Sequence, residues 1–247
     1  MKKTLLFIAV VILCLQCIAQ NTDSRVFELR TYYAADGKLD ALIERFQNHT
    51  LKLFRKHRME NIGYWTPTSN DKNLLTYILA YPSIEARETS WKAFQADAKW
   101  KKVRTKSELN GKLLNSVTSV FMKAADFSPQ ISSSKKGNRV FEISSYNMAP
   151  GKVNDLLSRF RNYTTSLFVK HGATNIDYWT TIEKGTIEPK LIYILAHNNE
   201  ETARKTLENL LSDSEWIKVK NESERNGKLV EKVESVYLNA LPFSNIK

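Results

Sequence analysis

The segment Arg25-Val-Phe-Glu-Leu29 occurs a second time, as Arg139-Val-Phe-Glu-Ile143. The offset between these two segments is 114 residues. It becomes 116 after a short insertion, where Tyr77-Ile-Leu-Ala80 matches Tyr193-Ile-Leu-Ala196. Self-similarity at a fixed spacing is the mark of a repeated structural unit. The chain of 247 residues therefore contains a tandem duplication.

The repeats divide the chain into two domains joined by a linker. We predict domain 1 over residues 25–127 and domain 2 over residues 139–243. The linker, residues 128–138, is rich in Ser and contains both Pro and Gly, a composition typical of flexible connections.

Each repeat has the same predicted order of strands and helices. β-branched and aromatic residues indicate strands, whereas apolar residues spaced three or four apart indicate helices. In domain 1 this predicts strands at 26–33, 61–66, 74–81 and 116–122, with helices at 38–57 and from 84 to about 110. The order strand, helix, strand, strand, helix, strand is that of the ferredoxin-like unit.

A four-stranded sheet with helices on one face leaves the other face without cover. Two copies in one chain can cover both open faces by packing sheet to sheet. We therefore predict an α+β fold, in which two tandem ferredoxin-like (βαββαβ) repeats form an intramolecular α+β barrel. This pseudo-dimer does not exclude further oligomers.

The first nineteen residues have the composition of a secretory signal peptide. Lys2 and Lys3 precede an apolar run, and small residues lead to a cleavage site after Ala19. Cleavage there leaves no cysteine in the mature chain, so we expect no disulfide and no cysteine metal ligand. We expect an exported, periplasmic or extracellular protein that is not inserted in the membrane. Lipidation at Cys17 is the less favoured alternative, because Gln16 stands where a small residue is needed.

The sequence resembles the NIPSNAP family in Phe27-Glu-Leu-Arg-Thr-Tyr32, the region of His57, Gly63-Tyr-Trp65 and the helix carrying Trp100. The resemblance covers nearly all of each repeat, but Ser144 replaces Arg30 in the second copy. It implies the fold of the dimeric α/β barrel superfamily, which includes cofactor-free monooxygenases and haem-binding proteins. The family has no agreed reaction and no established catalytic residues, so the resemblance implies neither for this chain.

Alternation along the first strand of each repeat places polar side chains on one face. We predict that this face lines the barrel interior and forms a ligand pocket from Glu28, Arg30, Tyr32, Glu142 and Tyr146. The alternative is a structural hydrogen-bond network, or pairs at the wet rim of the sheet.

The two glutamates of this set differ in their local partners. Arg30 follows Glu28 at a spacing of two and can pair with it, whereas Glu142 has only Ser144 in that position. Glu142 is therefore the candidate proton acceptor if the protein is an enzyme.

Two repeated histidines, His57 and His171, are secondary candidates for a general base or a ligand. A histidine at a helix end more often packs against its neighbours or caps the last carbonyls. We find no known catalytic or metal-binding motif, and we predict neither a metal nor a cofactor.

The formal net charge of +11 is spread over both repeats. The most basic run, Lys99 to Lys106, has its cations on the side of a predicted helix opposite Trp100 and Val103, which indicates a solvated face. We therefore predict no nucleic-acid partner.

Three hypotheses for function follow. The first is an exported protein that binds a small molecule in the barrel interior. The second is a cofactor-free oxygenase or isomerase that acts on a carbonyl compound. The third is a protein-interaction module without a ligand.

Overall fold

Both repeats fold in the predicted order in the computed structural model, which describes residues 23–131, 137–185 and 187–247. The predicted signal peptide and residues 132–136 of the predicted linker lie outside this range. Domain 1 contains β1 (Val26–Ala34), α1 (Leu39–Arg45), the π-helical turn η1 (Phe46–Thr50), α2 (Leu51–Lys56), β2 (Glu60–Pro67), β3 (Leu74–Tyr81), α3 (Ile84–Ala96), α4 (Ala98–Ser107) and β4 (Leu114–Ala124). Domain 2 contains β5 (Val140–Met148), α5 (Val153–Arg159), η2 (Phe160–Thr164), α6 (Thr165–Lys170), β6 (Thr174–Thr181), β7 (Lys190–His197), α7 (Glu200–Ser212), α8 (Ser214–Ser223) and β8 (Val230–Ala240).

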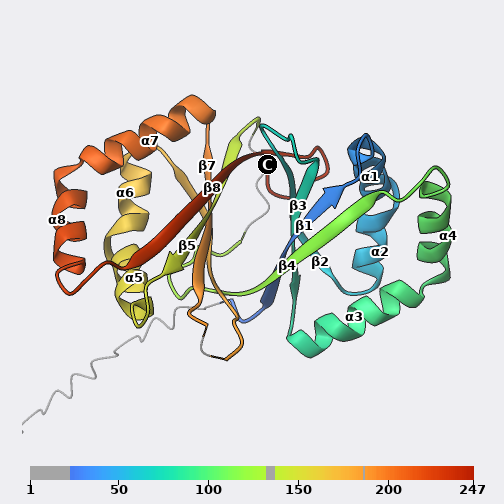
Figure 1. Cartoon of the computed structure of the whole chain (residues 1–247), viewed down its shortest axis with the longest axis horizontal. Coiled ribbons are helices and arrows are strands. Elements are labelled where there is room, and N and C mark those ends of the chain that lie inside the picture. The colour runs from blue at the N-terminus through green and yellow to red at the C-terminus, as the bar shows by residue number, and fades with distance from the viewer. Residues whose placement is uncertain (1–22, 132–136, 186) are drawn as a thin grey trace, which may run out of the picture.

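The strands of both domains close into one barrel in the order β1-β3-β2-β8-β5-β7-β6-β4. Two short antiparallel seams join the sheets: 65–67 of β2 pair with 238–240 of β8, and 122–124 of β4 pair with 179–181 of β6. The helices of domain 1 and those of domain 2 lie at opposite ends of the molecule (Figure 1). The predicted intramolecular α+β barrel is confirmed.

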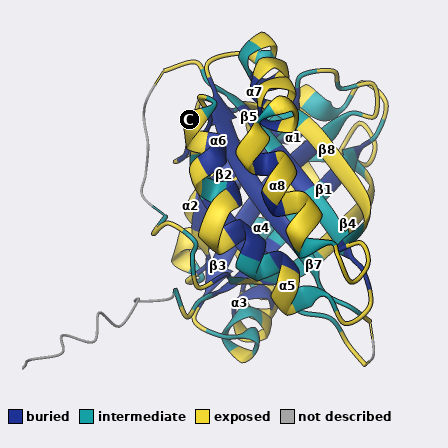
Figure 2. Cartoon of the chain, turned by 90° about the vertical axis from the view of Figure 1, so that its left-hand side faces the viewer, coloured by how far each residue is buried: buried dark blue, intermediate teal, exposed yellow. Residues whose placement is uncertain are grey.

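The barrel interior is an apolar core. It contains Phe27, Trp65 and Ile78 from domain 1, together with Phe141 and Trp179 from domain 2, all almost completely buried. The inner strands β2, β3 and β7 are largely buried, whereas β4, β8 and the outer faces of the helices are exposed over much of their length (Figure 2). Removing this apolar surface from water is the main force that holds the two domains together.

The predicted orientation of the first strand is wrong. Phe27 and Leu29 face the barrel interior, while Glu28, Arg30 and Tyr32 face the helices of domain 1. The physical reason is that the barrel interior offers apolar neighbours to Phe27 and Leu29, whereas α3 supplies polar partners for Glu28. A ligand pocket built from these residues inside the barrel is therefore excluded.

The second predicted helix of each repeat is two helices. Asp97 has extended backbone angles, and its side chain accepts hydrogen bonds from the Lys99 and Trp100 amides at 2.7 and 3.2 Å. It therefore acts as the N-cap of α4. Asp213 separates α7 from α8 in the same way.

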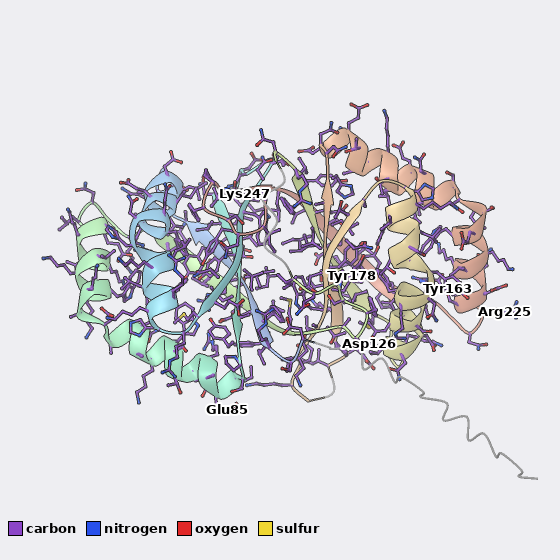
Figure 3. All side chains as sticks on the ribbon, turned by 180° about the vertical axis from the view of Figure 1, so that it is seen from behind. Glu85, Asp126, Tyr163, Tyr178, Arg225 and Lys247 are labelled. Carbon is purple, nitrogen blue, oxygen red and sulfur yellow. The ribbon has the colours of Figure 1, made fainter. Side chains whose placement is uncertain are left out.

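Each domain sends its C-terminal end across to the other. Beyond β8, Leu241 donates its amide to the Tyr64 carbonyl at 2.9 Å, and Ser244 Oγ accepts from the Tyr64 amide at 3.0 Å. Figure 3 shows Lys247, the end of this segment, away from the helices of domain 2. Beyond β4, Ser128 Oγ accepts from the Tyr178 amide of domain 2 at 2.7 Å. No helix in the described part of the chain is long and apolar enough to cross a membrane.

Candidate functional site

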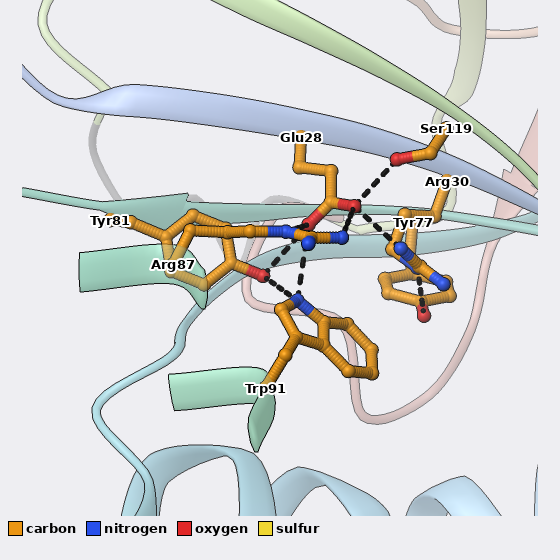
Figure 4. Close-up of polar contacts among 7 residues, drawn as sticks. All are labelled: Glu28, Arg30, Tyr77, Tyr81, Arg87, Trp91 and Ser119. Atoms are coloured by element: carbon orange, nitrogen blue, oxygen red, sulfur yellow. Dashed lines mark hydrogen bonds and ion pairs between the residues drawn. The ribbon is translucent and has the colours of Figure 1, made fainter. Parts of the chain in front are cut away.

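Glu28 lies completely buried between β1 and α3, at the centre of a polar cluster (Figure 4). Its Oε1 accepts hydrogen bonds from Arg30 Nη1 at 2.5 Å, Arg87 Nη2 at 2.7 Å and Ser119 Oγ at 2.5 Å. Its Oε2 accepts from Tyr81 Oη at 3.0 Å, Arg87 Nε at 3.1 Å and Trp91 Nε1 at 3.2 Å. Both oxygens of the carboxylate are thus fully engaged by donors.

This cluster holds Glu28 in its ionised form. Burial by itself would raise the pKa of the carboxyl group, but Arg87, Arg30 and Ser119 outweigh it and lower the pKa to about 2. A carboxylate with this pKa and six donors is a poor proton acceptor at neutral pH. Glu28 is therefore a structural anchor, as the predicted pairing with Arg30 implied.

A pocket of about 520 Å³ adjoins this anchor in domain 1. Arg30 and Tyr32 of β1 line it, so two of the predicted ligand residues do face a pocket, although on the opposite side of the sheet from the one predicted. Its walls are aromatic: Tyr32, Phe46, Phe54, Trp91, Phe94 and Trp100. The pocket that these two residues line thus lies between the sheet and the helices, and not in the barrel interior.

Cations surround this pocket. Its basic residues are Arg30, Arg45, Lys101, Arg104 and Lys112, and its acidic residue is Glu108. Glu108 accepts hydrogen bonds from Arg45 Nη1 at 2.9 Å and from Arg104 Nε at 3.3 Å. Lys101 and Arg104 are exposed, as the sequence predicted for this helix face, but they lie where the pocket meets solvent.

The corresponding cluster of domain 2 has fewer donors. Glu142 Oε1 accepts from Ser144 Oγ at 2.9 Å, and Glu142 Oε2 lies 3.3 Å from His197 Nε2. The imidazole of His197 is buried, and the contact to Glu142 meets the distance for an ion pair but not the geometry of a hydrogen bond. Glu142 thus has a basic neighbour that its own strand does not supply.

The five predicted pocket residues do not form one site. Glu28, Arg30 and Tyr32 lie under the helices of domain 1, whereas Glu142 and Tyr146 lie under those of domain 2. Tyr146 accepts a hydrogen bond from Tyr193 Oη at 3.2 Å and packs edge to face on Phe160. The apolar barrel core separates the two groups.

The repeated histidines connect helices. His57 Nε2 lies 2.8 Å from Oδ2 of Asp97, and His171 Nε2 lies 2.8 Å from Oδ2 of Asp213. Because each aspartate caps the following helix, each histidine fixes the end of one helix to the start of another. Neither lines the pocket of domain 1. The structural interpretation of these residues is thus supported by their geometry.

Several residues of this site were not selected from the sequence. Arg87 and Trp91 stand four apart on α3, and Arg45 lies at the end of α1. Their spacing on the buried side of helices was a usable signal, because an arginine among core residues needs an acceptor. Among the described residues, no group of three or more His, Cys, Asp and Glu side chains could hold a metal ion.

The fold and the two helix-covered sheets define a protein of the α+β barrel class. The NIPSNAP family model matches residues 27–129 and 141–245, so the chain belongs to the NIPSNAP family and carries two copies of its domain. An uncharacterised NIPSNAP domain protein from Burkholderia xenovorans is 25% identical over 42% of this chain and 99% of its own, with a TM-score of 0.38. None of the curated proteins compared with the chain matches it.

Whole-chain similarity extends to other solved structures. A candidate monooxygenase from Lactobacillus acidophilus aligns with a TM-score of 0.58 at 8% identity, covering 88% of this chain and 94% of its own. An anthrone oxidase-like protein aligns with a TM-score of 0.60 at 10% identity, covering 91% and 95%. At these identities the similarity shows a shared fold, and it transfers no reaction.

Proposed function

We propose that this protein binds a small organic molecule in the pocket between β1 and the helices of domain 1. The observation that carries the proposal is the pocket itself. Its volume of about 520 Å³ lies within the range of about 300–1,000 Å³ typical of ligand sites. Aromatic walls provide the apolar contact area that usually drives binding in such sites.

The test uses the neutral fluorescent probe N-phenyl-1-naphthylamine and a variant that narrows the pocket. Gln95 is exposed and lines the pocket, so Gln95→Trp places a large ring there without replacing a core residue. Leu211 is the matching exposed residue of domain 2, and Leu211→Trp is the control. We expect Gln95→Trp, and not Leu211→Trp, to weaken probe binding at least about tenfold. Equal binding by all three proteins would contradict the proposal.

We also propose that the protein is exported, with a mature chain that begins at Gln20. The support is the basic start, the apolar run and the small residues before the cleavage site. The intact mass of protein from the extracytoplasmic fraction tests this. A lipid adduct on Cys17, or retention of residues 1–19, would contradict it.

A second candidate function is proton transfer on a carbonyl compound, with Glu142 as the base. The 3.3 Å approach of His197 to Glu142 favours it, because a neighbouring imidazole can accept or return a proton. Glu142→Gln should then abolish turnover of the carbonyl compound, while the melting temperature of the protein changes little. Turnover unchanged in this variant would exclude Glu142 as the base.

A further inference from the structure

We infer that the ligand of the domain 1 pocket is an organic anion with a flat aromatic body, and that each chain binds one such ligand although it contains two domains. The inference rests on the proposed function and specifies the class and the number of ligands. It follows from the donors that line the pocket and from the residues that replace them in domain 2.

The charge of the pocket favours an anion. Five basic side chains line it, and its single acidic residue, Glu108, is already bonded to Arg45 and Arg104. Clefts lined by one sign of charge concentrate ligands of the opposite sign. A cationic ligand would be repelled, whereas a carboxylate or sulfonate would meet an excess of positive charge.

Two guanidinium groups also have donors to spare. Arg30 donates through Nε to Tyr77 Oη at 2.9 Å and through Nη1 to Glu28. Within the described residues, its Nη2 makes no hydrogen bond. Among the described residues, the Nε of Arg45, a residue only 5% exposed, is buried without a partner. An anionic oxygen of a ligand in the pocket would give Arg30 Nη2 an acceptor in a charge-assisted hydrogen bond, and the positive charge of Arg45 would add to the attraction.

The walls favour a flat aromatic body. The Arg30 guanidinium lies 4.4 Å from the centroid of the Trp91 ring, and the Phe94 and Trp100 rings are also 4.4 Å apart. Rings in this arrangement present faces and edges on which another aromatic ring can pack. The guanidinium plane of Arg30 offers a further stacking surface beside the charge.

Domain 2 has lost the features that the anion requires. Ser144 stands in the place of Arg30, and Ile217 in that of Lys101. Trp91 is replaced by Leu207, which is 48% exposed and forms no buried wall. Arg159 retains the place of Arg45, and among the described residues its Nε likewise has no partner, but β5 carries no arginine to accompany it. We therefore expect domain 2 to bind no equivalent ligand.

The experiment compares two probes that differ in charge. 1-Anilinonaphthalene-8-sulfonate carries a sulfonate, and N-phenyl-1-naphthylamine is the same ring system without it. Fluorescence titration and calorimetry of the full chain should show one sulfonate probe per chain, bound at least about tenfold more tightly than the neutral probe. The preference should decrease as salt is added.

Two exposed residues provide the variants, so that loss of folding does not obscure the result. Lys101→Ile introduces the residue of domain 2, and Arg104→Met removes a second cation while keeping a long side chain. Together they should weaken binding of the sulfonate probe about tenfold more than binding of the neutral probe. Lys220→Met, the domain 2 counterpart of Arg104→Met, is the matched control and should change neither.

The outcomes separate this inference from the proposed function. Equal affinity for the two probes would overturn the inference that the ligand is an anion, but the pocket would remain a binding site. Failure of both probes to bind would overturn the proposed function itself. Two sulfonate probes per chain, or weaker binding in Lys220→Met, would overturn the single site in domain 1.

Discussion

Glu28 and Glu142 occupy the same position in the two domains but have different surroundings. Glu28 is fully buried and bonded to two arginines, a tyrosine, a tryptophan and a serine. Glu142 has a serine and a nearby histidine. The backbone pairing of β1 and β5 is the same, so the difference arises from side chains alone. The carboxylate of domain 1 is held by two arginines beside a pocket, whereas among the described residues that of domain 2 has no arginine partner.

The difference between the domains with the largest expected effect on stability is at the position of Gly63 and Asp177. Gly63 has no side chain, and the Trp65 indole lies against it. Asp177 is buried, accepts from Ser128 and from the Tyr178 amide, and leaves Oδ2 without a partner in the described structure. Burial raises its pKa to about 8, so the folded protein retains a proton that the unfolded chain releases near pH 4.

We therefore expect stability to fall as the pH rises from about 4 to about 8, by roughly 5 kcal/mol, because the folded state binds the extra proton over this range. Asp177→Asn should remove this dependence. Urea unfolding of both proteins at several pH values measures it. Parallel pH profiles would show that Asp177 ionises freely.

Truncating the side chain at the position of Arg30 and Ser144 should affect domain 1 more than domain 2. Arg30→Ala leaves the buried Glu28 carboxylate with one arginine, and we expect a loss of about 3 kcal/mol in the free energy of unfolding. Ser144→Ala, its counterpart, should cost less than about 1 kcal/mol because it removes neutral hydrogen bonds. Urea titrations of both variants decide this. Equal losses would mean that Glu28 does not depend on its ion pairs.

Acid should weaken the Glu28 cluster. The pKa of Glu28 in the folded protein, about 2, is below its value of 4.5 in the unfolded chain, so its contribution is complete above pH 4.5 and is lost as the pH falls toward 2. We expect about 2–3 kcal/mol to be lost between pH 5 and pH 2. In Glu28→Gln that portion of the acid dependence should be absent from chemical denaturation curves.

Where the domains agree, they should respond alike. Asp97 and Asp213 each accept from a histidine and cap a helix, and lysine, histidine and backbone donors hold the pKa of both carboxyls well below the usual range. Asp97→Ala and Asp213→Ala should each lower Tm by about 2–4 °C. Calorimetry measures the Tm of both variants. A difference of more than a few degrees between them would show that the two histidine–aspartate contacts are not equivalent.

Most of the fold could be predicted from the repeats and from their periodicity. The orientation of β1 could not, because both of its faces are buried: one by the opposite sheet, the other by helices. Alternation separates Phe27 and Leu29 from Glu28 and Arg30, but it does not say which pair faces inward. The assumption that polar residues line the barrel gave the wrong answer.

The site was predicted only in part for a related reason. The pairing of Glu28 with Arg30 follows from their spacing on one strand, and the structure confirms it. Arg87 approaches the same carboxylate from α3, and that contact depends on tertiary packing. His197 is not repeated, since Tyr81 holds its place in domain 1, yet it is the basic neighbour of Glu142. Residues in which two copies differ proved as informative as residues that they share.

The seams of the barrel determine how the protein behaves when it is diluted. Each seam pairs only three residues of one domain with three of the other, and both sheets belong to a single chain. A barrel assembled from two separate chains dissociates when its concentration falls below its dissociation constant, whereas here closure is a unimolecular step. The midpoint of unfolding should therefore be independent of protein concentration, and the barrel should persist at concentrations where a two-chain barrel would fall apart.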